Sequence, residues 1–80
     1  MNIVSFNQII DLNHLLQKKD LQFKVHIRDA CGTQSFYIEQ IGNSGSIGLN
    51  EEIYDTIEKY FKSSDMTVVY HNNKHQFTIQ

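Results

Sequence analysis

The residues of this chain that could do chemistry gather in one short stretch, HIRDACGTQSFYIE, at positions 26–39. It holds the only cysteine of the sequence, Cys31, and a thiol can act as a nucleophile when a base lies beside it. His26 could supply that base, and Asp29 could orient the imidazole. However, His26 is expected on a solvent-facing strand position, and no predicted helix begins beside Cys31 to activate its thiolate. We therefore predict no catalytic residue and place a thiol-dependent enzyme third among the possible functions.

Metal binding is the second chemistry that these residue types suggest. The possible ligands are His26, Cys31, His71 and His75. Zinc sites are typically recognised by cysteine pairs in CxxC spacing or by histidines one helical turn apart. The chain has one cysteine, and its histidines do not share a predicted helix at that spacing. We predict no metal site and no cofactor.

Capture of an anion is the third chemistry, and it depends on Arg28. A guanidinium group presents a planar fork of donors that matches phosphate or carboxylate. The turn that ends in Ala-Cys-Gly could aim backbone N–H groups at the same point. A purely structural interpretation stays open beside this one: Asp29 could form an Asx-turn, Gly32 could supply a positive φ, and Arg28 could pair with Asp29 or Glu39.

The elements that must position this stretch occur in the same order twice. We expect a helix at about 5–19 and a hairpin whose strands are LQFKVHIR and TQSFYIEQ. A second helix, capped by Asn50 and ended by SSD, precedes a second hairpin made of MTVVYH and HQFTIQ. Placing Asp20 on Asp65 aligns the two halves, but at low residue identity, so convergence stays open beside duplication. The pattern predicts an α+β domain over residues 1–80, αββαββ, in which a four-stranded antiparallel sheet carries both helices on one face. Its halves, 1–41 and 49–80, are joined by a Gly/Ser linker at 42–48.

The first helix has a clear start and a broad predicted apolar face. Ser5 and Gln8 have the spacing of a capping box, and Val4 and Ile9 that of a hydrophobic staple. The apolar face is predicted to comprise Phe6, Ile9, Ile10, Leu12, Leu15 and Leu16.

The first hairpin is predicted to close through a four-residue loop, Asp29 to Gly32. In this register Val25 lies opposite Phe36 and Lys24 opposite Tyr37, so apolar residues share the face toward the helices. The opposite, open face then carries polar and aromatic side chains. We predict a ligand site on that face and in the hairpin loop, formed by His26, Arg28, Asp29, Cys31, Tyr37, Glu39 and His71.

Size and charge limit the possible partners. The formal net charge is −2, with acidic and basic residues interspersed, which argues against nucleic acid as the partner. The sequence shows no signal-peptide pattern and no apolar run of membrane-spanning length, so we expect no membrane partner and a cytoplasmic location. A chain of 80 residues buries a thin core, and a single cysteine cannot form an intramolecular disulfide. A homodimer or larger homo-oligomer is therefore expected.

The stretch HIRDACGTQSFYIE, with the helix before it and the acidic-capped helix after it, resembles the RDAC family of small bacterial proteins. Arg28, Asp29, Ala30 and Cys31 match the tetrapeptide for which that family is named. The resemblance covers nearly the whole chain and implies that this hairpin is important. It implies no reaction.

Two classes of function remain from these observations. The first is a non-enzymatic binding protein that sequesters a small anionic, nucleotide-like ligand and acts as a homo-oligomer. The alternative is an inhibitor or adaptor that binds another protein, such as a phage-encoded antagonist of a host defence enzyme, through the open sheet face or a strand edge.

Overall fold

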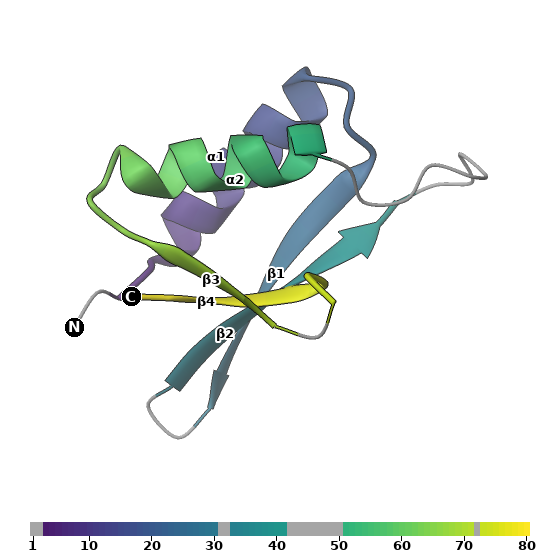
Figure 1. Ribbon diagram of the computed structural model, residues 1–80. Helices are drawn as coiled ribbons and strands as arrows, with labels where there is room; N and C mark the ends of the chain where they lie inside the picture. The colour runs from purple at the N-terminus through teal and green to yellow at the C-terminus, as the bar shows by residue number, and fades with distance from the viewer. Residues whose placement is uncertain (1–2, 31–32, 42–50, 72) are drawn as a thin grey trace.

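The computed structural model describes residues 3–30, 33–41, 51–71 and 73–80. Its elements follow the order α1 (Phe6–Lys18), β1 (Phe23–Ala30), β2 (Thr33–Gln40), α2 (Glu51–Lys62), β3 (Val68–His71) and β4 (Gln76–Ile79). The strands form one antiparallel sheet in the order β1-β2-β4-β3, and both helices lie on the same side of it (Figure 1). The predicted αββαββ fold is therefore confirmed. The linker at 42–48, the Asn50 cap and Cys31 with Gly32 lie outside the described residues.

Helix α1 begins as its sequence predicts. The Gln8 backbone N–H donates to Ser5 Oγ at 3.2 Å, and the Ser5 backbone N–H donates to Gln8 Oε1 at 2.9 Å. This reciprocal pair satisfies two donors that a helix start would otherwise leave open. The predicted apolar face was wrong at two positions, because Phe6 is 70% exposed and Ile10 is 50% exposed. No helix in the described part of the chain is long and apolar enough to span a membrane.

The core lies between the two helices and the sheet. It consists of Val4, Ile9, Leu12, Leu16, Phe23, Val25, Phe36, Ile38, Ile53, Ile57, Phe61 and Phe77. At its centre Phe36 of β2 stacks on Phe77 of β4, with ring centroids 5.0 Å apart, and Phe61 of α2 packs against both rings. The residues that the sequence predicts to share one core between strands and helices are all buried except Val68, which is half-buried; the buried ones are Leu12, Leu16, Phe23, Val25, Phe36, Ile38, Ile57, Phe61 and Phe77.

The predicted register of the first hairpin was wrong by two residues. Val25 lies opposite Ile38, and Ile27 lies opposite Phe36, so that Asp29 and Ala30 belong to β1 and not to a loop. Two residues, not four, therefore connect the strands. A two-residue slip leaves every side chain on its predicted face, because side chains alternate along a strand. It does change the cross-strand partners, which matters for the site.

Two side-chain carboxamides bind the backbone across elements. Asn13 of α1 accepts from the Val25 N–H at 2.7 Å and donates to the Val25 carbonyl at 3.0 Å. Gln34 of β2 makes the same two-bond contact with Val4, accepting from its N–H and donating to its carbonyl, each at 2.9 Å. These pairs fix α1 over β1, with the start of the helix near the tip of the first hairpin.

Candidate functional site

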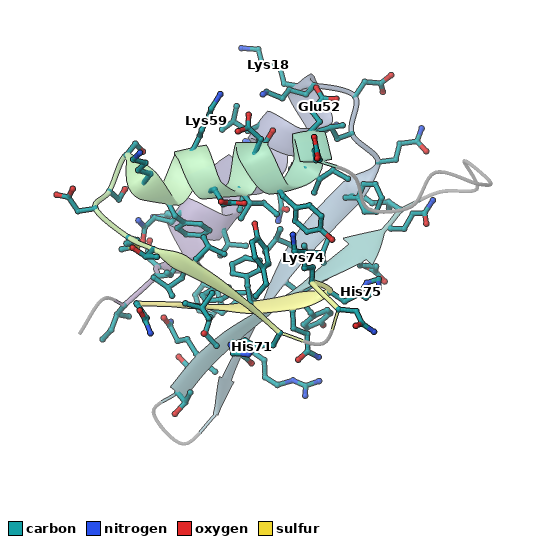
Figure 2. All side chains as sticks on the ribbon, in the orientation of Figure 1. Lys18, Glu52, Lys59, His71, Lys74 and His75 are labelled. Atoms are coloured by element: carbon teal, nitrogen blue, oxygen red, sulfur yellow. The ribbon has the colours of Figure 1, made fainter. Side chains whose placement is uncertain are left out.

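The candidate site lies on the sheet face that the helices leave uncovered. A cross-strand row of side chains spans all four strands on this face, and its members are His26, Tyr37, Gln76 and His71 in spatial order. Figure 2 shows His71 on this side of the sheet, away from the helix layer that carries Lys59. The row exists because the true register, unlike the predicted one, places His26 directly opposite Tyr37.

His26 and Tyr37 form a stacked pair at one end of this row. Their ring centroids are 4.8 Å apart and their planes are inclined by 16°. His26 Nε2 also lies 2.7 Å from Glu39 Oε1, and this contact is an ion pair when the imidazole is protonated. The carboxylate therefore orients the ring against Tyr37, which remains 37% exposed. An exposed, oriented aromatic pair of this kind can stack with a further planar group.

Arg28 stands beside the stacked pair. Its Cζ lies 5.9 Å from the centroid of the Tyr37 ring, within the range of a cation–π contact. Among the described residues Arg28 makes no ion pair, because Glu39 is engaged by His26 and Asp29 points to the other face of the sheet. The structural interpretation of Arg28 as the partner of Asp29 or Glu39 is thus not realised in the described chain.

The structure brings four of the seven predicted site residues together: His26, Arg28, Tyr37 and Glu39. Asp29 is separated from them because it shares the helix-side face with Val25, four residues earlier in β1. His71 is separated because three strand spacings, roughly 14 Å, lie between β1 and β3. Its Nε2 instead lies 3.0 Å from Thr78 Oγ1. Cys31 lies outside the described residues, and its predicted role stays a prediction.

A second polar cluster joins α2 to the β3–β4 hairpin, and the sequence reasoning missed it. The Tyr54 and Tyr70 rings meet edge to face at 5.1 Å, and the Lys74 ammonium lies over both of them. Tyr70 donates its hydroxyl proton to Glu58 Oε2 at 2.8 Å. Burial, followed by this hydrogen bond, raises the pKa of Tyr70 well above its usual range. The cluster fastens the second hairpin to the helix, and only the helical spacing of Tyr54 and Glu58 could have indicated it.

Two surface grooves are found away from the stacked pair. One, of about 930 Å³, runs between α1 and the start of β1 and is lined by Ile10, Asn13, His14, Gln17, Asp20, Leu21, Gln22, Phe23, Lys24 and Ile41. The other, of about 570 Å³, lies along α2 and is lined by Glu51, Glu52, Tyr54, Asp55, Glu58 and Lys74. Neither includes Arg28 or Tyr37. Within the described ranges, no group of three or more His, Cys, Asp or Glu side chains is arranged to hold a metal ion.

Comparisons of the chain with protein-family models, with curated proteins and with solved structures give no match. The resemblance of residues 26–39 to the RDAC proteins therefore stays a prediction.

Proposed function

We propose that this protein is a non-enzymatic binding protein that holds a small anionic, nucleotide-like ligand on its open sheet face. The observation that carries the proposal is the position of Arg28, a cation without an ion-pair partner in the described chain, beside the stacked His26 and Tyr37. A guanidinium group favours phosphate, and an exposed aromatic pair favours a planar base. A nucleotide presents both groups on one small molecule.

The charges around Arg28 support an anion over a cation. Lys24 and Arg28 both project from the open face of β1, whereas Asp29 projects from the opposite face. Glu39, the one acidic side chain of the stacked cluster, is 2.7 Å from His26 and is therefore partly neutralised when the ring is protonated. A phosphate beside Arg28 would meet a local excess of positive charge although the whole chain carries −2.

Calorimetric titration with adenosine monophosphate, adenosine triphosphate and inorganic phosphate tests the proposal. We expect Arg28→Ala to weaken nucleotide binding by roughly ten- to hundredfold, the usual loss for a hydrogen bond to a charged group. Arg28→Lys should restore only part of it, because an ammonium cannot reproduce the planar fork. Cys31→Ser should bind as the wild type does.

Lys59→Ala is the matched control, because Lys59 is an exposed cation on the helix side and pairs with Asp55 at 3.0 Å (Figure 2). Circular dichroism verifies that each variant is folded. Absence of binding for all three probes would contradict the proposal, and so would an Arg28→Ala protein that binds as tightly as the wild type. Loss of binding in Cys31→Ser alone would mean that the Cys31 thiol, and not Arg28, is required for binding.

A protein partner on the same face is the second candidate. The observation that favours it is the length of the row from His26 to His71, which crosses the whole sheet and exceeds what a small ligand needs. In this case substitutions at both ends of the row, Arg28→Ala and His71→Ala, should each weaken a purified stoichiometric complex. With a nucleotide bound at the stacked pair, His71→Ala should have no effect.

A further inference from the structure

The outer edge of β1 has no neighbouring strand in the sheet, because the strand order is β1-β2-β4-β3. Asn13 binds the Val25 backbone, so the Val25 N–H and carbonyl point outward from that edge. Outward-pointing backbone groups recur at every second residue of a strand. Ile27 and Asp29 therefore also present their N–H and carbonyl groups outward.

These two residues leave the edge open. Val25 is already occupied by Asn13, but no hydrogen bond from any described residue reaches the outward groups of Ile27 or Asp29. Among the described residues beyond Val25, the open stretch thus comprises two outward residues, Ile27 and Asp29. Such an edge is a template for pairing with another strand.

Exposed apolar side chains of α1 lie above the same stretch. Phe6 and Ile10 precede Asn13 by seven and three residues, so the three share one stripe of the helix. Asn13 is fixed at Val25, and Val4 is fixed at Gln34, whose neighbour across the hairpin is Asp29. Val4 directly precedes the N-cap Ser5, and the helical path from Phe6 to Asn13, about 11 Å, falls within the roughly 13 Å of strand between Val25 and Asp29. Phe6 and Ile10 therefore overhang the open edge.

We propose that a second copy of this chain pairs with this edge, β1 against β1 in antiparallel orientation about a two-fold axis at Arg28. In this register Ile27 of each copy lies opposite Asp29 of the other, and all four open pairs of backbone groups are satisfied together. The register with Asp29 opposite Asp29 would place each Ile27 opposite position 31, beyond the end of β1 at Ala30, so the strand would not satisfy the open groups of Ile27. The register with Ile27 opposite Ile27 would require the Val25 groups that Asn13 occupies.

The occupant is a second copy because the edge is complementary to itself. A partner that uses its own β1 edge brings a second Phe6 and Ile10 stripe, so two exposed apolar surfaces are buried against each other. The strand pairing and the helix contact are then made by one two-fold operation. A chain that buries only a thin core gains stability from this contact.

The pairing also has a consequence for the anion site, which rests on the proposed function. Arg28 of one copy lies directly opposite the second copy's Arg28, on the open face and at a Cα separation of about 4.5 Å. Guanidinium groups on directly opposite strand positions repel each other, and an anion between them removes the repulsion. The anion site beside Tyr37 is then composed of both copies, and nucleotide should tighten the dimer.

Sedimentation equilibrium of the wild type, Phe6→Glu and Ile10→Glu tests the interface. Both positions are exposed in one chain, so the substitutions should leave the fold intact, but each buries a carboxylate in the dimer. We expect the dimer dissociation constant to rise by at least about tenfold. Asn7→Glu is the matched control, because it adds the same charge to the same helix outside the stripe. A wild type that stays monomeric up to millimolar concentration overturns the proposal, as does a dimer unaffected by either substitution.

Amide hydrogen exchange of the wild type provides a test without substitutions. The Ile27 and Asp29 amides should become protected as the concentration rises through the dimer dissociation constant. Unprotected amides in a demonstrated dimer would overturn the proposed edge. A dimer that binds none of adenosine monophosphate, adenosine triphosphate and inorganic phosphate would keep this interface and reject the proposed function, whereas a monomer that binds one of them would do the reverse.

Discussion

The two αββ halves of the molecule end their helices in the same way but extend their hairpins differently. After α1, the Asp20 N–H donates to the Gln17 carbonyl and the Leu21 N–H donates to the Leu16 carbonyl. After α2 the same two bonds run from Asp65 and Met66 to Lys62 and Phe61. Both aspartates have a left-handed backbone, with φ of 58° and 59°. These are two copies of one helix-ending motif, 45 residues apart, as the alignment of Asp20 with Asp65 predicts.

The hairpins differ by four residues. Strand β1 begins at Phe23 and β3 begins at Val68, an offset of 45, whereas the central pair of Phe36 opposite Phe77 has an offset of 41. The first hairpin is therefore longer, and β2 pairs with β1 along eight residues but with β4 along two. The added length carries Arg28 and the open edge beyond the common core. The shorter hairpin is instead held to α2 through Tyr54 and Tyr70. The first half thus carries the candidate binding surface, whereas the hairpin of the second half is packed against α2.

The largest expected effect concerns the aromatic pair that the two hairpins share. Phe36 and Phe77 are 1% and 0% exposed, and their rings stack at 5.0 Å. Phe36→Ala and Phe77→Ala should each lower the free energy of unfolding by about 3–5 kcal/mol, because each leaves a cavity at the centre of the core. Urea unfolding measures both losses.

The double variant sharpens this test. Because the rings touch, the loss from both substitutions should be smaller than the sum of the single losses. A loss below about 1 kcal/mol for Phe36→Ala, together with a strong loss for Tyr37→Ala, would mean that β2 presents its other face to the helices.

A smaller effect, confined to the second half, is expected for Tyr70→Phe. The substitution removes the hydrogen bond to Glu58 and should cost about 1 kcal/mol near neutral pH. Burial and this bond raise the pKa of Tyr70 in the folded state, so its contribution is complete below pH 10, the ordinary value, and is lost as the pH rises above it. Between pH 8 and pH 11, the free energy of unfolding should fall less steeply for Tyr70→Phe than for the wild type. Parallel curves for the two proteins would contradict the role assigned to this tyrosine.

The features that depend on local periodicity could be predicted from the sequence. The features that depend on contacts with distant backbone groups could not. Alternation in the strands and the capping box at Ser5 were sufficient for the order of elements, the two faces of the sheet and nearly all of the core. The hairpin register was wrong because Asp29 and Gly32 both favour turns, and the pattern is unchanged by a slip of two residues. The stacking of His26 on Tyr37 depends on that register and could not be predicted without it.

The apolar face of α1 failed for a different reason. Phe6 and Ile10 have the spacing of core residues, and only the position of α1 on the sheet determines that they are exposed. The carboxamides of Asn13 and Gln34, which define that position, bind backbone groups 12 and 30 residues away. Such bonds leave no local signature, because any exposed Asn or Gln has the same appearance in the sequence.

The smallest expected effect compares the two helix ends directly, through Asp20→Gly and Asp65→Gly. A left-handed backbone costs an L-residue energy that glycine does not incur, and neither carboxylate has a hydrogen bond or ion pair with any described residue. Glycine also increases the entropy of the unfolded chain, which offsets part of the gain. Each substitution should therefore raise the free energy of unfolding by about 0.5 kcal/mol, by the same amount in both halves. Chemical unfolding of the single variants and the double variant measures this, and the two gains should add because α1 and α2 end at opposite ends of the helix layer (Figure 1). If one substitution stabilises the protein and the other destabilises it, the two helix ends are not equivalent, and the interpretation of the molecule as two copies of one αββ unit fails at the point where the copies agree best.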